Sequence, residues 1–509
     1  MKRINLNNRE PINPDDPSYA TLLQNIQGNI LNDNGRHYEQ LILVRFPNDQ
    51  ESGRLWVRRF AEEITSAKKH RAAAKLRNER LEILKEEMKN AGVTYPDDMW
   101  KPEWEKRWKA LYKEKPFVAF YLSAQGYRTL GVPESQIPHD FAFQRGMKAA
   151  QERLRDDHGQ WELHYLDEPG FDALILFAHD DEDALRNMML EHEKQLIRIG
   201  ATTKAEETGA ALYSGPRVER AQPREHYGFR DGISNPLFLA TDYCHDLKRP
   251  PLQSAPTACE RADEGMKKWD PFAPLGLVLV EEPGGAPDRC GSYLVLRKLE
   301  QNVKLFRIEI ERLATRLQGA GTVSRAEAMA MGRFRDGMPI VSSDSPDKSP
   351  IHYNHFNYED NIGRCPFHAH ILKANPRRDR SRDADVNPAS DRWRRIARRG
   401  ITYGERTQNP DGSTNFDDLP TKPVGLFFMC YQRDIMHQFE FIQQSWLNYM
   451  NPGIGLDPIA GQGDGGHRPQ RWPDTYGGVP NVELDLRKTV TLRGGEYFFA
   501  PSIPFLKAL

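Results

Sequence analysis

Six short runs of apolar residues, rich in branched and aromatic side chains, recur along this chain of 509 residues and constrain its fold more than any other feature. Each run has the length of a single strand, and stretches of helical composition lie between several of them. The predicted strands cover residues 40–46, 116–124, 171–179, 291–299, 424–432 and 494–502. The predicted helices cover residues 54–92, 142–156, 182–200, 302–317 and 434–450.

This alternation predicts an α+β fold made of two ferredoxin-like domains, each an antiparallel sheet with peripheral helices. The second half repeats the element order of the first without repeating its sequence. We expect the first half to span residues 1–235 and the second to span residues 291–509. A proline-rich irregular linker, residues 236–290, is expected between them.

Composition excludes several function classes. Lys and Arg total 71 against 72 Asp and Glu, so no overall field favours nucleic acid or an anionic membrane. The mean hydropathy is −0.72 and no run of about eighteen apolar residues occurs, which argues against a membrane span. The first twenty residues lack the apolar core of an export signal, and the five cysteines lack Cys-X-X-Cys spacing. We therefore expect a cytoplasmic protein.

Two long segments stand out by their polarity. The helix predicted over 54–92 is so charged that it must be solvated, with one apolar stripe formed by Ala73, Leu76, Leu84 and Met88. The region 374–422 is polar, rich in arginine and predicted to be mostly loop. A long ordered loop inside a domain is often functional.

The segment RCPFHAHILKANPR (364–377) contains two histidines, His368 and His370, which would point to the same side of an extended chain. The spacing leaves three interpretations open. The histidines can be structural, or they can form a zinc or copper site with Cys365. Alternatively, one of them is the axial ligand of a haem iron, with its other imidazole nitrogen held by a carboxylate.

Two further segments are weak signals when each is taken alone. The turn GFRDG (228–232) holds Asp231 beside a glycine, a combination that is common in turns. The segment RRIARRGITYG (394–404) groups arginines before a glycine, which is typical of a solvated face. Arg398 and Arg399 are nevertheless candidates for stabilising negative charge that develops on oxygen.

In their order along the chain, these segments resemble the dye-decolorizing peroxidases, haem peroxidases named for oxidising bulky anthraquinone dyes. The resemblance covers nearly the whole chain, and eight motifs in the family's order make it specific. They are NIQGNILNDNGR (25–36), HYGFRDGISNP (226–236), GSYLVLRKLEQNV (291–303), MGRFRDGMPI (331–340), CPFHAHILKANPR (365–377), ARRGITYG (397–404), GLFFMCYQ (425–432) and GGEYFFAPS (494–502).

The resemblance implies haem b held between the two halves, hydrogen peroxide as oxidant and an organic electron donor, with the oligomeric state left open. By position, Asp231 corresponds to the distal acid and Arg398 to the distal arginine, while His370, rather than His368, corresponds to the iron ligand. Asp231 is expected to move a proton between the peroxide oxygens and Arg398 to stabilise the departing oxygen. Because an ordinary carboxylate is a weak base at neutral pH, we expect an acidic activity optimum.

The chain departs from the family pattern after the second histidine. Leu372 stands where arginine is common, so Lys373 or Arg377 is expected to replace any contact of that arginine with a haem propionate. The extra length at 65–105 and 374–395 indicates one of the larger, late-branching subgroups, of the C/D type.

Supporting residues follow from the same resemblance. Three carboxylates are candidates to hold the iron-ligating histidine, and Asp457 is preferred because a loop after a long helix can turn its acid back toward the cofactor. Leu426 and Phe428 alternate along a strand and are expected either to line the haem pocket or to pack in the core. The two other candidate carboxylates are Asp434 and Glu440.

Large dyes do not fit a tight haem pocket, so electrons are expected to arrive through a surface aromatic residue, Tyr403 first and Trp393 second. The main rival function is a haem-binding protein that carries haem or handles its iron without peroxidase turnover. Such a carrier needs His370 but has no need of Asp231 and Arg398. The zinc or copper site would make the distal pair coincidental.

Overall fold

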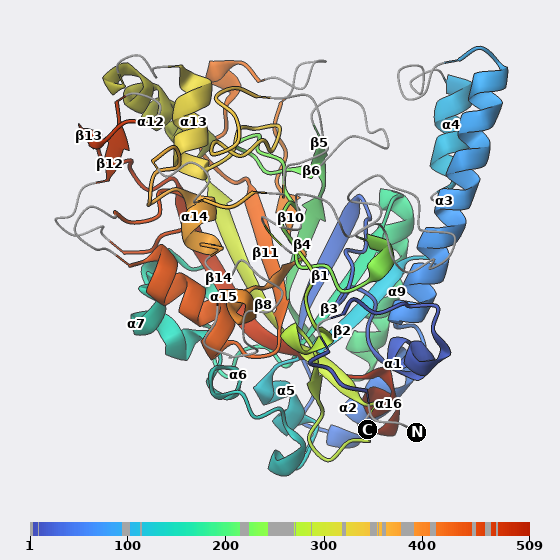
Figure 1. Cartoon of the computed structure of the whole chain (residues 1–509). Coiled ribbons are helices and arrows are strands. Elements are labelled where there is room, and N and C mark those ends of the chain that lie inside the picture. Colours follow the sequence, from blue (N-terminus) through green and yellow to red (C-terminus); the bar gives the residue numbers. More distant parts are fainter. Residues whose placement is uncertain are drawn as a thin grey trace.

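A single ten-stranded antiparallel sheet runs through the computed structural model, in the order β10-β11-β8-β14-β2-β3-β1-β4, with β7 beside β8 and β9 beside β11 (Figure 1). The structure describes residues 4–8, 10–93, 102–111, 115–213, 223–242, 269, 271–286, 288–317, 322–346, 354, 356–358, 363–377, 391–407, 414–449, 455–463, 470–474 and 477–509.

Each half contributes four strands to the main path, in the same relative order. In the first half these are β1 (Tyr38–Arg45), β2 (Phe117–Leu122), β3 (Ala173–His179) and β4 (Thr202–Ala210). In the second half they are β8 (Cys290–Gln301), β10 (Ile401–Tyr403), β11 (Gly425–Gln432) and β14 (Val490–Ala500). Numbered along the chain, both sets lie in the order second, third, first, fourth, so two ferredoxin-like units are confirmed.

Within the main sheet, the two units meet at a short joint between β14 and β2. Among the described residues, β14 and β2 share one ladder pair, Phe499 with Leu122. Gln27 reinforces this joint: its side-chain amide donates to the carbonyls of Phe120 (2.7 Å) and Pro501 (3.0 Å) and accepts from the N–H of Phe120 (2.9 Å). A buried glutamine thus supplies hydrogen bonds where the ladder between the halves is short.

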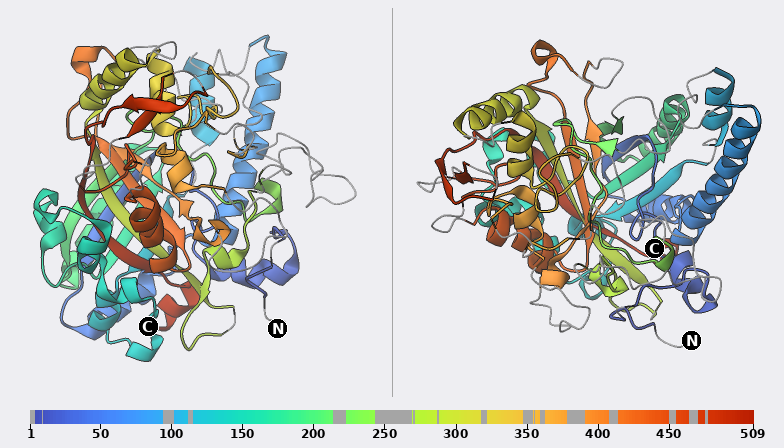
Figure 2. Two further views of the ribbon diagram at one scale, coloured as in Figure 1. Left: turned by 60° about the vertical axis from the view of Figure 1, so that its left-hand side comes forward. Right: turned by 45° about the horizontal axis from the view of Figure 1, so that its top comes forward.

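The single helix predicted over 54–92 is wrong, because the chain forms two helices there. The first, α2 (Gln50–Phe60), packs near the sheet, and the second, α3 (Ala67–Asn90), projects beside α4 (Pro102–Leu111) (Figures 1 and 2). Ser66 starts α3, since its side chain accepts from the Lys69 N–H, as N-cap residues do. Of the predicted stripe, Leu84 and Met88 are buried, whereas Leu76 is exposed.

Other helices agree more closely with the sequence. The helix predicted over 182–200 is α9 (Glu182–Arg198), and that over 302–317 is α12 (Val303–Arg316). The helix predicted over 434–450 is two π-helical segments, η8 (Met436–Glu440) and η9 (Ile442–Leu447). Within 142–156 the helices are short, α6 (Phe141–Arg145) and α7 (Gln151–Leu154). The remaining helices include α1 (Ala20–Asn25), α5 (Ala124–Thr129), α8 (Leu163–Leu166), α13 (Val323–Met331), α14 (His370–Ala374), α15 (Asp391–Arg394) and α16 (Ile503–Ala508).

Short strands complete the structure: β5 (Leu212–Tyr213), β6 (Pro223–Arg224), β7 (Val280–Glu281), β9 (Ala397–Arg398), β12 (Arg471–Pro473) and β13 (Pro480–Glu483). The sequence did not predict β4, a strand at the end of the sheet with only two buried residues, or β10, three residues within the region expected to be loop. Among the helices that the structure describes, none is both long and apolar enough to cross a bilayer.

Candidate functional site

A cavity of about 260 Å³ lies between the sheet of the second half and the surrounding helices and loops. One wall is the face of the sheet that carries Leu299 of β8 and Leu426 and Phe428 of β11. The other walls come from the GFRDG turn, from α14 and from η9 and the loop after it. Predominantly apolar walls with a few polar groups are typical of a cofactor or ligand site. Leu426 and Phe428 therefore line a pocket, which was one of the two positions expected for them.

The GFRDG turn holds Asp231 at this cavity. Gly228 (φ +97°) and Gly232 (φ +77°) adopt backbone conformations that side chains disfavour, so the turn can be this tight. The Asp231 carboxylate accepts from the Gly232 N–H at 2.7 Å and from Nη1 of Arg398 at 3.2 Å. The carboxylate keeps about a quarter of its surface exposed.

Arg398 is brought to Asp231 by β9, which pairs with β11 near one end of the sheet and lies opposite Cys430. Its backbone N–H donates to Oδ1 of Asn235 (3.0 Å), and its carbonyl accepts from Nδ2 of the same residue (3.2 Å). Nη2 donates to the Ile233 carbonyl at 2.6 Å. Two segments that are 167 residues apart are therefore held together by both backbone and side chains.

A second carboxylate, not predicted from the sequence, supports the turn from within. Glu225 lines the cavity and accepts from the N–H groups of Tyr227 (2.8 Å) and Phe229 (2.9 Å) and from Nε2 of Gln301 (2.6 Å). Burial raises the pKa of Glu225 even though these hydrogen bonds act to lower it. The only signal in the sequence was its place three residues before the turn.

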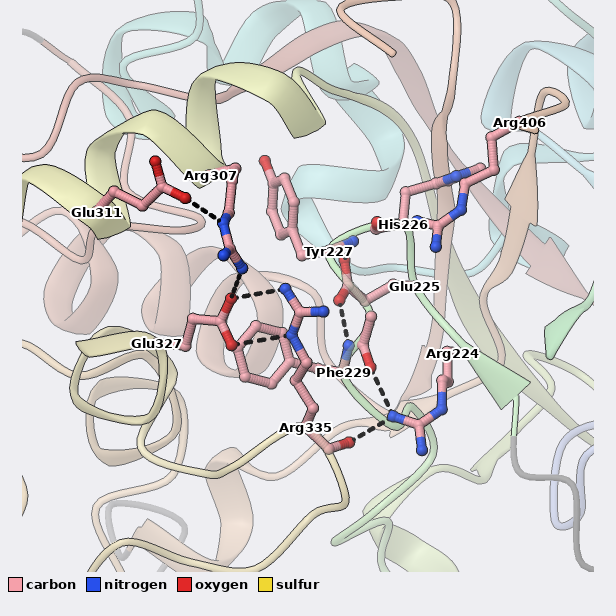
Figure 3. A network of polar contacts seen from close by, with 11 residues as sticks. Arg224, Glu225, His226, Tyr227, Phe229, Arg307, Glu311, Glu327, Arg335 and Arg406 are labelled. Carbon is pink, nitrogen blue, oxygen red and sulfur yellow. Dashed lines mark hydrogen bonds and ion pairs between the residues drawn. The ribbon is translucent and has the colours of Figure 1, made fainter. Parts of the chain in front are cut away.

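Ion pairs and hydrogen bonds from neighbouring residues stabilise the GFRDG turn, as Figure 3 shows. Arg335, from a second Phe-Arg-Asp-Gly segment (334–337), lies between Glu327 and Arg224: its guanidinium pairs with Glu327 at 2.6 Å, and its carbonyl accepts from Arg224 at 2.7 Å. Arg224 also donates to the Gly228 carbonyl at 2.6 Å. The Arg335 carbonyl accepts from the N–H of Arg230 as well, which joins the two turns.

His370 begins α14, and its imidazole lines the cavity. Nδ1 lies 3.0 Å from Oδ2 of Asp457, a fully buried carboxylate. The other oxygen of Asp457 accepts from the N–H groups of Ile459 and Ala460, each at 2.8 Å. Burial acts to raise the pKa of Asp457, but His370 and these two N–H groups outweigh it, so the pKa lies below its usual value. The carboxylate is therefore charged and fixes the orientation of the imidazole.

The other candidate carboxylates serve elsewhere. Asp434 pairs with exposed His437, and Glu440 pairs with Arg153 and accepts from the Tyr497 hydroxyl.

His368 takes no part in the cavity. It is fully buried, its ring meets that of Trp472 edge-on at 4.2 Å, and burial lowers the pKa of His368 to about 3. Burial also raises the pKa of Cys365 to about 12, so its thiol stays protonated. In the described part of the chain, the one group with potential ligand atoms all within 4.8 Å is Glu162, His164 and Glu207. The alternative of a zinc or copper site at Cys365, His368 and His370 is therefore not supported by the described residues.

The two cations expected to replace the missing arginine lie in different places. Arg377 lines the cavity and is buried; it donates to the carbonyls of Asn354 (2.8 Å) and Phe356 (2.7 Å) and to the Ser234 hydroxyl (3.1 Å). Lys373 is outside the cavity lining and donates to three backbone carbonyls instead. The prediction that Lys373 could contact an anion in the cavity is therefore wrong.

Neither aromatic residue expected to relay electrons lines the cavity. Tyr403 is only 7% exposed and packs against Phe427 with ring centroids 4.6 Å apart, so the surface position expected for it is wrong. Trp393 is half-buried, and the guanidinium of Arg433 lies 5.7 Å from its ring centroid.

Known proteins resemble this chain in both sequence and fold. A multifunctional dye peroxidase of Amycolatopsis sp. is 38% identical over 412 residues, which cover 77% of this chain and 82% of that protein. The crystal structure of a DyP-type peroxidase of Anabaena sp. superposes with a TM-score of 0.79 at 35% identity, covering 99% of this chain and 98% of that one. A structure of a dye peroxidase from Amycolatopsis sp. gives a TM-score of 0.77 at 32% identity, covering 98% and 99%. No family model matches the chain.

Proposed function

Since this chain belongs to the dye-decolorizing peroxidases and is a peroxidase, we propose that it binds haem b in the cavity beside His370 and reduces hydrogen peroxide there at the expense of bulky organic donors. The observation that carries this proposal is that the His370–Asp457 pair and the Asp231–Arg398 pair line or border the same cavity. A haem carrier, the rival function, has a use for the first pair only.

The groups around the cavity fit haem b. Leu426, Phe428 and Ile371 offer an apolar surface to a porphyrin. Arg297 lines the cavity and suits a propionate: its Nη2 pairs with buried Asp156, but its Nη1 has no hydrogen-bond partner in the described structure. Arg377 suits the other propionate, because the partners given above for it are neutral oxygens. His370 would hold the iron through its second nitrogen, with Asp457 increasing the basicity of the ring.

Bound haem would supply an iron that gives two electrons to peroxide and regains them one at a time from the organic donor. The protein's part is to move one proton and to stabilise one charge. The Asp231 carboxylate would take the proton from the inner peroxide oxygen and return it to the outer one. Arg398, already aimed at this carboxylate, would stabilise negative charge on the departing oxygen.

Names of relatives suggest the donor class. The Amycolatopsis relative is named for dyes, and one solved dye-decolorizing peroxidase is a complex with 2,6-dimethoxyphenol. We propose anthraquinone dyes and phenolics as donors for this chain. Trp393 is the relay that we retain, since it keeps partial exposure. The division at 1–235, 236–290 and 291–509 and the C/D-type subgroup also remain proposals.

The test is an absorption spectrum of the haem-loaded protein before and after one equivalent of hydrogen peroxide. We expect a Soret band that shifts within seconds in the wild type, a much slower shift in Asp231→Asn, and loss or alteration of the band in His370→Ala. Asp336→Asn is the matched control, because Asp336 occupies the same place in the second Phe-Arg-Asp-Gly segment without lining the cavity. A band unaffected by peroxide would favour the carrier.

A further inference from the structure

Lys373 is a buried cation that lies one helical turn after His370 and outside the cavity. It is 7% exposed, and its Nζ donates to the carbonyls of Tyr449 (2.7 Å), Gly455 (2.7 Å) and Leu447 (3.4 Å). Hydrogen bonds from a charged donor are stronger than neutral ones, and a buried ammonium needs all three.

The three acceptors belong to the segment that carries Asp457. Leu447 ends η9, Tyr449 lies two residues after it, and Gly455 lies two residues before Asp457. The Leu447 carbonyl also accepts from the N–H of Asp457 at 3.1 Å. Lys373 and the Asp457 backbone thus share one carbonyl, so the ammonium joins the helix of His370 directly to the loop of its carboxylate partner.

Gly455 explains why the loop can come so close. A Cβ atom at this position would lie 2.7 Å from Cγ of Gln470, and Nε2 of Gln470 donates to the Leu456 carbonyl at 2.9 Å. The loop is therefore packed from the far side by Gln470 and held on the near side by Lys373.

We propose that Lys373 is a positioning residue that locks the helix of His370 to the loop of Asp457, and thereby sets the strength of their hydrogen bond and the reduction potential of the haem iron. The inference rests on the proposed function, in which His370 binds that iron. A carboxylate that accepts a hydrogen bond from the ligating imidazole makes the ring more basic, which favours the oxidised metal. A weaker hydrogen bond would therefore raise the potential.

The direction of the change separates this role from two simpler ones. Loss of a nearby positive charge, acting through space alone, would stabilise the oxidised iron and lower the potential. A lysine that only caps the end of η9 would affect stability and leave the potential unchanged. Only a positioning role predicts a rise.

The experiment is a spectroelectrochemical titration of the haem-loaded protein in four forms: wild type, Lys373→Met, Asp457→Asn and the double variant. We expect both single changes to raise the potential, Lys373→Met by less, and the Lys373 effect to vanish when Asp457 is already asparagine. A Lys373→Met potential equal to or below that of the wild type would overturn the proposal. So would a shift of the same size in both backgrounds.

Lys373→Gln keeps an N–H donor without the charge and serves where the methionine variant fails to fold; its potential is expected between those of wild type and Asp457→Asn. Failure of the proposed function has a different signature. In that case the wild type takes up no haem, or His370→Ala keeps an unaltered haem spectrum, and the positioning role falls with it.

Discussion

The side-chain amide of Asn235 hydrogen-bonds to both the backbone N–H and the backbone carbonyl of Arg398. The Arg398 guanidinium donates to Asp231, which lies four residues before Asn235 in the chain. Residues 231–235 thus position the distal pair, Asp231 and Arg398. They supply the acid, the Ile233 carbonyl that accepts from the guanidinium, and the Asn235 amide that holds the Arg398 backbone.

Replacing Arg398 tests its share of the chemistry. We expect Arg398→Leu to slow the reaction with peroxide by on the order of 10²–10³-fold, the usual cost of removing a group that stabilises charge on oxygen. Haem affinity should change little. Stopped-flow absorption at the Soret band measures the rate, and haem titration measures the affinity. An unchanged rate would assign the charge stabilisation to another residue.

Removing the Asn235 amide should change the peroxide reaction only through Arg398. Asn235→Ala deletes both hydrogen bonds to the Arg398 backbone and is expected to slow the peroxide reaction by about tenfold, less than loss of the guanidinium itself. In an Arg398→Leu background the same change should have little further effect. If the two changes multiply instead, Asn235 has a function of its own.

The buried Glu39 carboxyl should make the free energy of unfolding depend on pH. Burial raises the pKa of Glu39 to about 8 in the folded chain, against a hydrogen bond from Asn34. Between the unfolded pKa, about 4.3, and about 8, only the unfolded chain releases this proton, so stability falls by up to about 1.4 kcal/mol per pH unit as pH rises. Glu39→Gln should match the wild type near pH 4 and be more stable near pH 8 in denaturant titrations. Glu405→Gln, at an exposed position, is the control and should show no such gain.

Gln27 should hold the two halves together in solution. Gln27→Leu leaves the N–H and C=O of Phe120 without their side-chain partner, at a cost of about 1–3 kcal/mol for each buried group. We expect lower stability and, because the ladder that joins the halves within the sheet is short, separate unfolding transitions for tryptophan fluorescence and circular dichroism. Gln125→Leu removes only a contact with Thr129 and is the control. A single shared transition in Gln27→Leu would mean that the halves still unfold as one unit.

Sequence alone identified the elements whose burial leaves an apolar pattern. All six predicted strands exist because each crosses a packed core. β4 and β10 were missed because an edge strand with only two buried residues and a three-residue strand carry no such pattern. The break at Ser66 was overlooked although serine is a common N-cap.

Residue roles depended on the direction of side chains, which sequence does not give. The contact between His370 and Asp457 was expected and is present, while its effect on iron stays a prediction. Lys373 or Arg377 was expected at a haem propionate, yet backbone carbonyls also attract an ammonium, and Lys373 donates to three of them. Glu225 was not expected at all, since a lone glutamate before a turn has no distinguishing pattern.

The joint between the halves also determines at what point during synthesis the fold can be completed. Gln27 binds partners on both Phe120 and Pro501, so its site does not exist until the ribosome has passed residue 501. During that interval β2 lies at the edge of the first-half sheet, and unpaired strand edges invite association with other chains. Translation of the second half is therefore a period of exposure for the first, which ends when β14 arrives.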